Sequence, residues 1–191
     1  MSSKRVCVFC GSSDRVSPEY LEIAARVGRL LADREMTLIY GGADVGMMGA
    51  LAKASLDAGG SVIGVIPRAI NDRVGHRSLS ETVVVETMHE RKAKMHELAD
   101  CFLALPGGLG TMEELFEALT WQQLGYHAKP CGILNSGEFY DALLRFLDHL
   151  VEENFLKLAH RELVLVDEDP HSLLERIQHA RPKLIDKWKD D

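Results

Sequence analysis

The 191-residue sequence lacks features that would assign it to several common classes of protein. It has no apolar run that approaches the length of a membrane span, and its N-terminus lacks the long apolar region of a signal peptide. It also lacks the excess of basic residues typical of nucleic-acid binding, because 22 Lys and Arg are outnumbered by 29 Asp and Glu and the formal net charge is −7. We therefore expect a cytoplasmic protein that binds neither a membrane nor a nucleic acid.

Motifs for metal or redox chemistry are also missing. Cys7 and Cys10 have CxxC spacing, but residues three apart on a strand point to opposite faces. Buried free thiols are therefore favoured over a zinc or redox site for the four cysteines, which all fall in expected strands: Cys7, Cys10, Cys101 and Cys131. The eight histidines include no HExxH pattern. We expect neither a metal nor a cofactor.

The composition is that of an ordinary globular protein, with 46% hydrophobic and 27% charged residues. The length is sufficient for one domain with a sizeable core. We expect this domain to cover residues 1–181 and the charged tail, residues 182–191, to be frayed.

Short apolar runs alternate with helical patterns along almost the whole chain. This alternation predicts an α/β fold with a Rossmann-type, doubly wound parallel sheet of about seven strands and helices on both faces. One polar stretch, residues 71–78, shows no periodicity, and we expect a mobile loop there, near the mouth of a cleft. The strands are expected at residues 6–10, 37–40, 61–66, 82–86, 101–105, 131–135 and 163–166.

Residues 103–114 are the most informative stretch, because they predict a buried strand, a glycine turn and a helix. Three glycines after Pro106 let the backbone approach a ligand that side chains would exclude. The N-terminus of the following helix attracts anions, and Glu114 lies one turn into that helix. A phosphate site beside a carboxylate suggests chemistry on a phosphorylated small molecule. The structural alternative is a plain turn followed by acids that the helix dipole favours.

Two further glycine turns follow expected strands, at residues 11–13 and 41–49. The carboxyl ends of parallel strands lie at one edge of a sheet, so the three turns together predict a nucleotide-sized pocket. Arg91 and Lys92 open the helix after the fourth strand on the same edge, where they are suited to phosphate or ribose oxygens. A solvated basic patch is the alternative for these two residues.

The helix that carries Glu114 has two faces that we expect to be buried. At ~100° per residue, one face is an apolar core stripe formed by Met112, Leu115, Phe116 and Leu119. The nearly opposite face carries Glu114, Ala118, Trp121 and Gly125, which is an unusual set for a solvated surface. A partner subunit is the simplest cover, so we expect a homodimer through Glu114, Ala118 and Trp121.

The motifs also resemble a known family. Residues 106–114, PGGLGTMEE, resemble the PGGxGTxxE signature of the LONELY GUY proteins. These are cytokinin riboside 5′-monophosphate phosphoribohydrolases, which are often mislabelled as lysine decarboxylases. Similar family landmarks follow in family order over nearly the whole chain: CGSS at residues 10–13, GGADVGMMG at residues 41–49, MHERK at residues 88–92 with Met95, and TWQQLG at residues 120–125.

The resemblance implies that water cleaves the N-glycosidic bond of a nucleoside 5′-monophosphate, AMP included, to give a free base and ribose 5-phosphate. By matching positions, it implies Arg91 and Glu114 as the catalytic pair. A fixed carboxylate suits this reaction, because departure of the base leaves positive charge on the ribose. The implied substrate-binding positions are Gly11, Ser12, Gly42, Met88, Lys92, Gly107, Gly108, Leu109, Gly110 and Thr111.

Two departures from the family pattern stand out. Leu109 replaces a tyrosine of plant members, and Ala69 replaces a glutamate that contacts substrate, in a segment 69–80 that looks longer than in plants. Base specificity is therefore left open. A lysine decarboxylase would need a lysine Schiff base with pyridoxal phosphate, and the signature turn holds no lysine. A general purine monophosphate nucleosidase and a non-catalytic nucleotide-binding or sensor protein are the remaining alternatives.

Overall fold

The computed structural model describes residues 4–76, 78–183 and 185. Most of the predicted frayed tail, residues 184 and 186–191, lies outside these described residues. Within them, seven strands form one sheet in the order β4-β3-β2-β1-β5-β6-β7, and each neighbouring pair is parallel. This confirms the predicted fold class. The strands are β1 Arg5–Phe9, β2 Thr37–Tyr40, β3 Val62–Pro67, β4 Glu81–Val85, β5 Cys101–Ala104, β6 Cys131–Leu134 and β7 Val164–Asp167.

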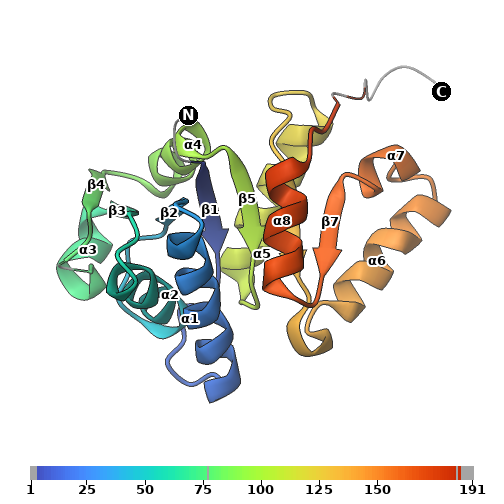
Figure 1. The fold of residues 1–191 in the computed structure, drawn as a ribbon. Coiled ribbons are helices and arrows are strands. Elements are labelled where there is room, and N and C mark those ends of the chain that lie inside the picture. The colour runs from blue at the N-terminus through green and yellow to red at the C-terminus, as the bar shows by residue number, and fades with distance from the viewer. Residues whose placement is uncertain (1–3, 77, 184, 186–191) are drawn as a thin grey trace.

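Helices cover both faces of the sheet (Figure 1). The helices α1 Pro18–Asp33, α2 Gly46–Asp57 and α8 Pro170–His179 pack on one face, in a core that includes Val6 and Val8. The other face carries α4 Met88–Leu98 and α5 Leu109–Gln123, and its core includes Cys7 and Phe9. Alternate residues of one strand thus enter opposite cores, as the pleat requires. The remaining helical elements are α3 Arg68–Val74, η1 Ser136–Glu138, α6 Asp141–Glu152 and α7 Leu158–Arg161.

The prediction of a loop over residues 71–78 is wrong in part, because α3 extends through Val74. This short helix has no buried residue, so its sequence carries no apolar stripe that could have indicated it. Its C-terminal end is instead tied to the turn after β2. The Asp44 N–H donates to the Val74 carbonyl at 2.8 Å, and the His76 N–H donates to the Gly42 carbonyl at 2.9 Å.

The four cysteines are buried and free, as the strand pattern predicted. Burial raises the pKa of the Cys101 thiol to about 12, so this sulfur is not a reactive thiolate at neutral pH. Cys10 lies one residue beyond β1 rather than within it. Among the described residues, no helix has the length and apolar character needed to cross a membrane.

Candidate active site

The three glycine turns meet at the carboxyl edge of the sheet, as predicted. β1 and β5 are neighbours at the point where the strand order reverses direction, which is where open α/β sheets bind ligands. The turn after β1 contacts the turn after β5 directly, since the Gly11 N–H donates to the Pro106 carbonyl at 3.0 Å. A Cβ atom on Gly107 would lie 2.1 Å from Oγ1 of Thr111, so only glycine allows this close packing.

The turn after β5 is open toward solvent at the N-terminus of α5. Gly108 is the N-cap residue, with a φ of −92° that any residue can adopt. A Cβ atom added to Gly108 or Gly110 would meet nothing within 4 Å. The protein itself therefore gives no packing reason for glycine at these two positions. The open space lies where the unpaired N–H groups of a helix N-terminus can bind an anion.

A cavity of about 330 Å³ lies between this turn and the turn after β1. Four of the predicted substrate-binding residues line it: Gly11, Ser12, Gly107 and Gly108. Its other walls are largely apolar and come from α1, α2 and the segment after β6. Tyr20 and Phe139 meet there edge to face, with ring centroids 5.7 Å apart. These two aromatic residues could not be identified from the sequence, because neither belongs to a motif.

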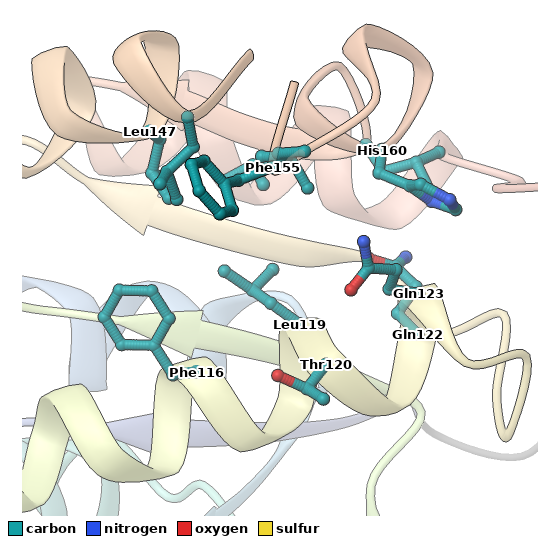
Figure 2. Close-up of a pocket in the computed structure, with 12 residues that line it drawn as sticks. Phe116, Leu119, Thr120, Gln122, Gln123, Leu147, Phe155 and His160 are labelled. Atoms are coloured by element: carbon teal, nitrogen blue, oxygen red, sulfur yellow. The ribbon is translucent and has the colours of Figure 1, made fainter. Parts of the chain in front are cut away.

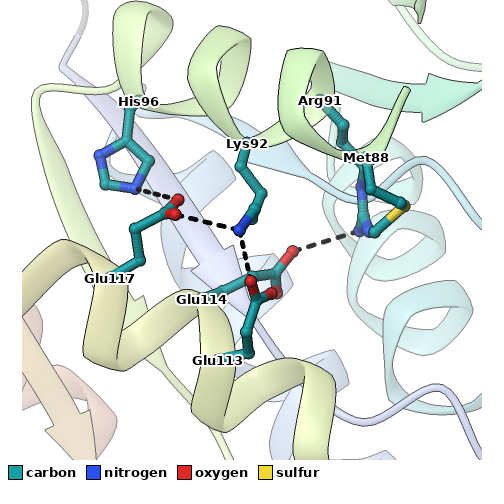
Figure 3. A network of polar contacts seen from close by, with 7 residues as sticks. All are labelled: Met88, Arg91, Lys92, His96, Glu113, Glu114 and Glu117. Atoms are coloured by element: carbon teal, nitrogen blue, oxygen red, sulfur yellow. Dashed lines mark hydrogen bonds and ion pairs between the residues drawn. The ribbon is translucent and has the colours of Figure 1, made fainter. Parts of the chain in front are cut away.

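Arg91 and Glu114, predicted as a pair, face each other from α4 and α5 (Figure 3). Nη2 of Arg91 lies 3.4 Å from Oε1 of Glu114, and each side chain is only 10% exposed. Nε of Arg91 also donates to the Val65 carbonyl at 3.2 Å, which fixes the guanidinium on the sheet. Met88 contributes its sulfur atom, 3.9 Å from Nη1 of Arg91. Burial raises the pKa of the Glu114 carboxyl, and the charge of Arg91 opposes this rise.

Gly41 is a further residue of this site, and its sequence position alone does not indicate a role there. A Cβ atom at Gly41 would lie 2.0 Å from Nη2 of Arg91, so the guanidinium occupies the space that a side chain would take. The turn after β2 therefore contacts the Arg91–Glu114 pair. Gly42, which was predicted, has a φ of +77° and lies against Ile66. A glycine next to a buried arginine leaves no signal in the sequence until the fold brings the two together.

Lys92 points toward two protein carboxylates. Its ammonium is hydrogen-bonded to Glu113 and lies 3.0 Å from Oε2 of Glu117 (Figure 3). The hydrogen bond that Lys92 donates to Glu113 is the main cause that raises the pKa of Lys92. The predicted contact of Lys92 with substrate phosphate stays a prediction.

Leu109, also predicted to bind substrate, is 90% exposed, so its side chain contacts little of the protein.

The interpretation of the second face of α5 as a subunit interface is wrong for Ala118. Ala118 is fully buried within its own chain, in the core that also holds Cys7 and Phe102. Trp121 packs on His96, with ring centroids 4.4 Å apart. The physical reason is that α5 lies on the sheet along this face, so the burial does not require a partner. Association of two copies stays a prediction.

The expected core stripe of α5 faces α6 and α7. Leu115 is buried, whereas Phe116 and Leu119 line an apolar cleft of about 190 Å³ together with Leu147 and Phe155 (Figure 2). No residue of the predicted site lines this cleft.

In the described part of the chain, no group of three or more His, Cys, Asp or Glu side chains is placed to hold a metal ion.

Solved structures share the fold. A molybdenum cofactor binding protein from Rippkaea orientalis is 25% identical, with a TM-score of 0.70 over 93% of this chain and 97% of the other. A molybdenum cofactor carrier protein from Chlamydomonas reinhardtii is 19% identical, also with a TM-score of 0.70 and coverage of 93% and 97%. At this identity, the second protein is evidence for the fold alone.

The sequence relatives are considerably more similar. A family model described as "possible lysine decarboxylase" matches residues 48–177. A cytokinin riboside 5′-monophosphate phosphoribohydrolase of Rhodococcoides fascians is 46% identical over 92% of this chain and 89% of its own length. One from Arabidopsis thaliana is 43% identical over 94% and 85%. The chain therefore belongs to the LONELY GUY family of cytokinin riboside 5′-monophosphate phosphoribohydrolases.

Proposed function

We propose that this protein hydrolyses the N-glycosidic bond of nucleoside 5′-monophosphates, AMP included, to free base and ribose 5-phosphate. The observation that carries the proposal is the buried ion pair between Arg91 and Glu114. Glu114 lies about one helical turn beyond the open glycine turn at the N-terminus of α5. The names of relatives that share 42–46% of its sequence support the proposal. The reaction needs a binding site for the phosphate and a fixed carboxylate near the ribose.

The phosphate is proposed to lie at residues 108–111. Open space beside Gly108 and Gly110 and the positive end of the α5 dipole support this placement. The cavity lined by Gly11, Ser12 and Gly107 adjoins this proposed phosphate-binding site and is large enough for another part of the nucleotide. Its volume of about 330 Å³ lies in the range of small-molecule sites.

Glu114 is proposed to act on the ribose. The bond between C1′ and the base nitrogen breaks, and its electron pair leaves with the base. The ribose then carries positive charge, which the Glu114 carboxylate stabilises while it orients the attacking water. The water oxygen bonds to C1′, and one proton of that water is transferred, in the net reaction, to the departing base. Arg91 holds the carboxylate in place, and Gly41 and the sulfur of Met88 contact this arginine.

The direct test is to incubate the purified protein with AMP and with isopentenyladenosine monophosphate and to follow free base by chromatography. Much faster release from the prenylated nucleotide would indicate a cytokinin-activating enzyme, whereas similar rates would indicate a general purine monophosphate nucleosidase. Intact nucleotide that stays bound without base release would refute hydrolysis and favour a non-catalytic binding protein. The matched control is Glu114→Gln, which keeps the size of the side chain and one acceptor oxygen but removes the charge.

We also infer a homodimer that uses the C-terminal end of α5. The support is apolar surface at this end, where Leu124 and Tyr126 are exposed and Tyr126 meets the partly buried Trp121 edge to face. Sedimentation velocity of Tyr126→Asp tests this inference, since an unchanged dimer in that variant would contradict it.

We also propose a cytoplasmic location, as expected from the sequence, because a phosphorylated nucleotide substrate is found inside cells.

A further inference from the structure

Three carboxylates converge on α4 from the second and third turns of α5, and α4 offers two cations to meet them. Arg91 pairs with Glu114, while Lys92 pairs with Glu113 and Glu117 (Figure 3). We propose that Lys92 is a positioning residue, which holds Glu113 and Glu117 and thereby reserves the Arg91 guanidinium for Glu114. The proposal rests on the proposed function, in which Glu114 is the catalytic carboxylate.

The geometry of Lys92 fits a role inside the protein. Its side chain is 10% exposed, and its ammonium lies between carboxylates on successive turns of α5. An ammonium group has three donors, and two of them are already directed at Glu113 and Glu117. A substrate phosphate approaching Lys92 would also meet the negative charge of these two glutamates. The contacts therefore favour the protein carboxylates over phosphate as the partners of Lys92.

The charges around Glu114 explain why such a residue is needed. Glu113 and Glu117 both raise the pKa of Glu114, whereas Arg91 and Lys92 lower it. Without Lys92, two acids next to Glu114 would lose their counter-charge and compete for Arg91. A neutral Glu114 could no longer stabilise positive charge on a ribose.

The other titratable groups near this cluster cannot replace Lys92. Nε2 of His96 lies 3.9 Å from Glu117, but burial lowers the pKa of His96 to about 4, so this imidazole is neutral at pH 7. Cys7 in β1 and Cys10 just after it interact electrostatically with Glu114 and Arg91, and burial raises the pKa of both thiols. Both thiols are neutral as well, and they supply no positive charge.

The experiment measures the ionisation of Glu114 directly. Protein labelled with ¹³C at the glutamate carboxyls is titrated by NMR, and Glu114→Gln identifies the Glu114 signal. In Lys92→Met, we expect the titration midpoint of Glu114 to rise by about one pH unit, a tenfold change in its ionisation equilibrium. In the triple variant Lys92→Met, Glu113→Gln, Glu117→Gln, the midpoint should return toward the wild-type value, because the unpaired acids are gone.

The triple variant also protects the test against misfolding, since it removes the acids that Lys92→Met would leave unpaired. A midpoint that does not move in Lys92→Met, or that stays raised in the triple variant, would overturn the proposal. In the base-release assay, kcat/KM is measured against pH. The fall of kcat/KM on the acid side should move to higher pH in Lys92→Met, together with the titration midpoint of Glu114. A higher KM for AMP in both variants, with an unmoved acid limb, would identify Lys92 as a substrate ligand instead. If the wild type releases no base, the proposed function fails while the NMR result still decides the role of Lys92.

Discussion

Gly41→Ala tests whether the Arg91–Glu114 pair is the reacting centre without altering either residue. The added Cβ would lie 2.0 Å from Nη2 of Arg91 and 3.2 Å from the sulfur of Met48. Both contacts are with the ends of flexible side chains, so the backbone can stay in place. Gly41 does not have a positive φ, so alanine is also compatible with the backbone conformation. We therefore expect a folded protein with a displaced guanidinium.

The size of the displacement follows from ordinary contact distances. Carbon contacts become favourable near 3.5 Å, so Nη2 of Arg91 must retreat by about 1.5 Å. The bond from Nε of Arg91 to the Val65 carbonyl and the 3.4 Å ion pair with Glu114 cannot both survive that movement. A misplacement of about 1 Å at a reacting centre can cost roughly 10²-fold in rate, which corresponds to ~2.7 kcal/mol. We expect kcat/KM for AMP to fall by at least this factor.

The assay is base release from AMP, combined with urea unfolding to show that the variant is folded. A double-mutant cycle with Arg91→Lys supplies the control, because lysine lacks the Nη2 atom that the new Cβ would strike. In the Arg91→Lys background, Gly41→Ala should cost much less than it costs in the wild type. Undiminished activity of Gly41→Ala, or an equal loss in both backgrounds, would refute the reasoning.

Three further predictions concern the carboxylate, the glycine turn and a buried histidine. Glu114→Gln should lower kcat by about 10³-fold, with AMP binding retained in calorimetry; normal turnover would remove Glu114 from the mechanism. Gly108→Ala and Gly110→Ala should leave the urea midpoint almost unchanged, since neither Cβ meets protein atoms, yet raise KM for AMP if phosphate lies there. Burial lowers the pKa of His96 to about 4, although Glu117 lies 3.9 Å away. As the pH falls from about 6.5 toward 4, His96 is therefore protonated in the unfolded chain before it is protonated in the folded protein. The free energy of unfolding should therefore decrease by up to ~3 kcal/mol over this range. His96→Gln should flatten that decrease in urea titrations, and an unchanged pH dependence would contradict the assignment.

Local chemistry explains what could be predicted. Buried parallel strands are continuous apolar runs, and they alternate with helices of 3.6-residue period, so the seven strands follow from the pattern, with ends that are exact only for β2 and one residue off at one or both ends of the others. The glycine turns follow strands, and in a parallel sheet that fact is sufficient to bring Gly11 and Gly107 to one edge. The meeting of Arg91 and Glu114 was implied by the resemblance to a family rather than by spacing, because the two residues lie on different helices.

Tertiary structure decided what no local pattern contains. α3 forms without an apolar stripe because backbone bonds tie Val74 to the turn after β2. Ala118 shares the face of Glu114, but only the position of α5 on the sheet determines that its cover is the chain's own core. Residue types likewise did not reveal that Lys92 meets two glutamates or that Arg91 occupies the empty side of Gly41. Periodicity specifies which residues are buried, whereas the partner of a buried charge depends on how two helices approach each other in space.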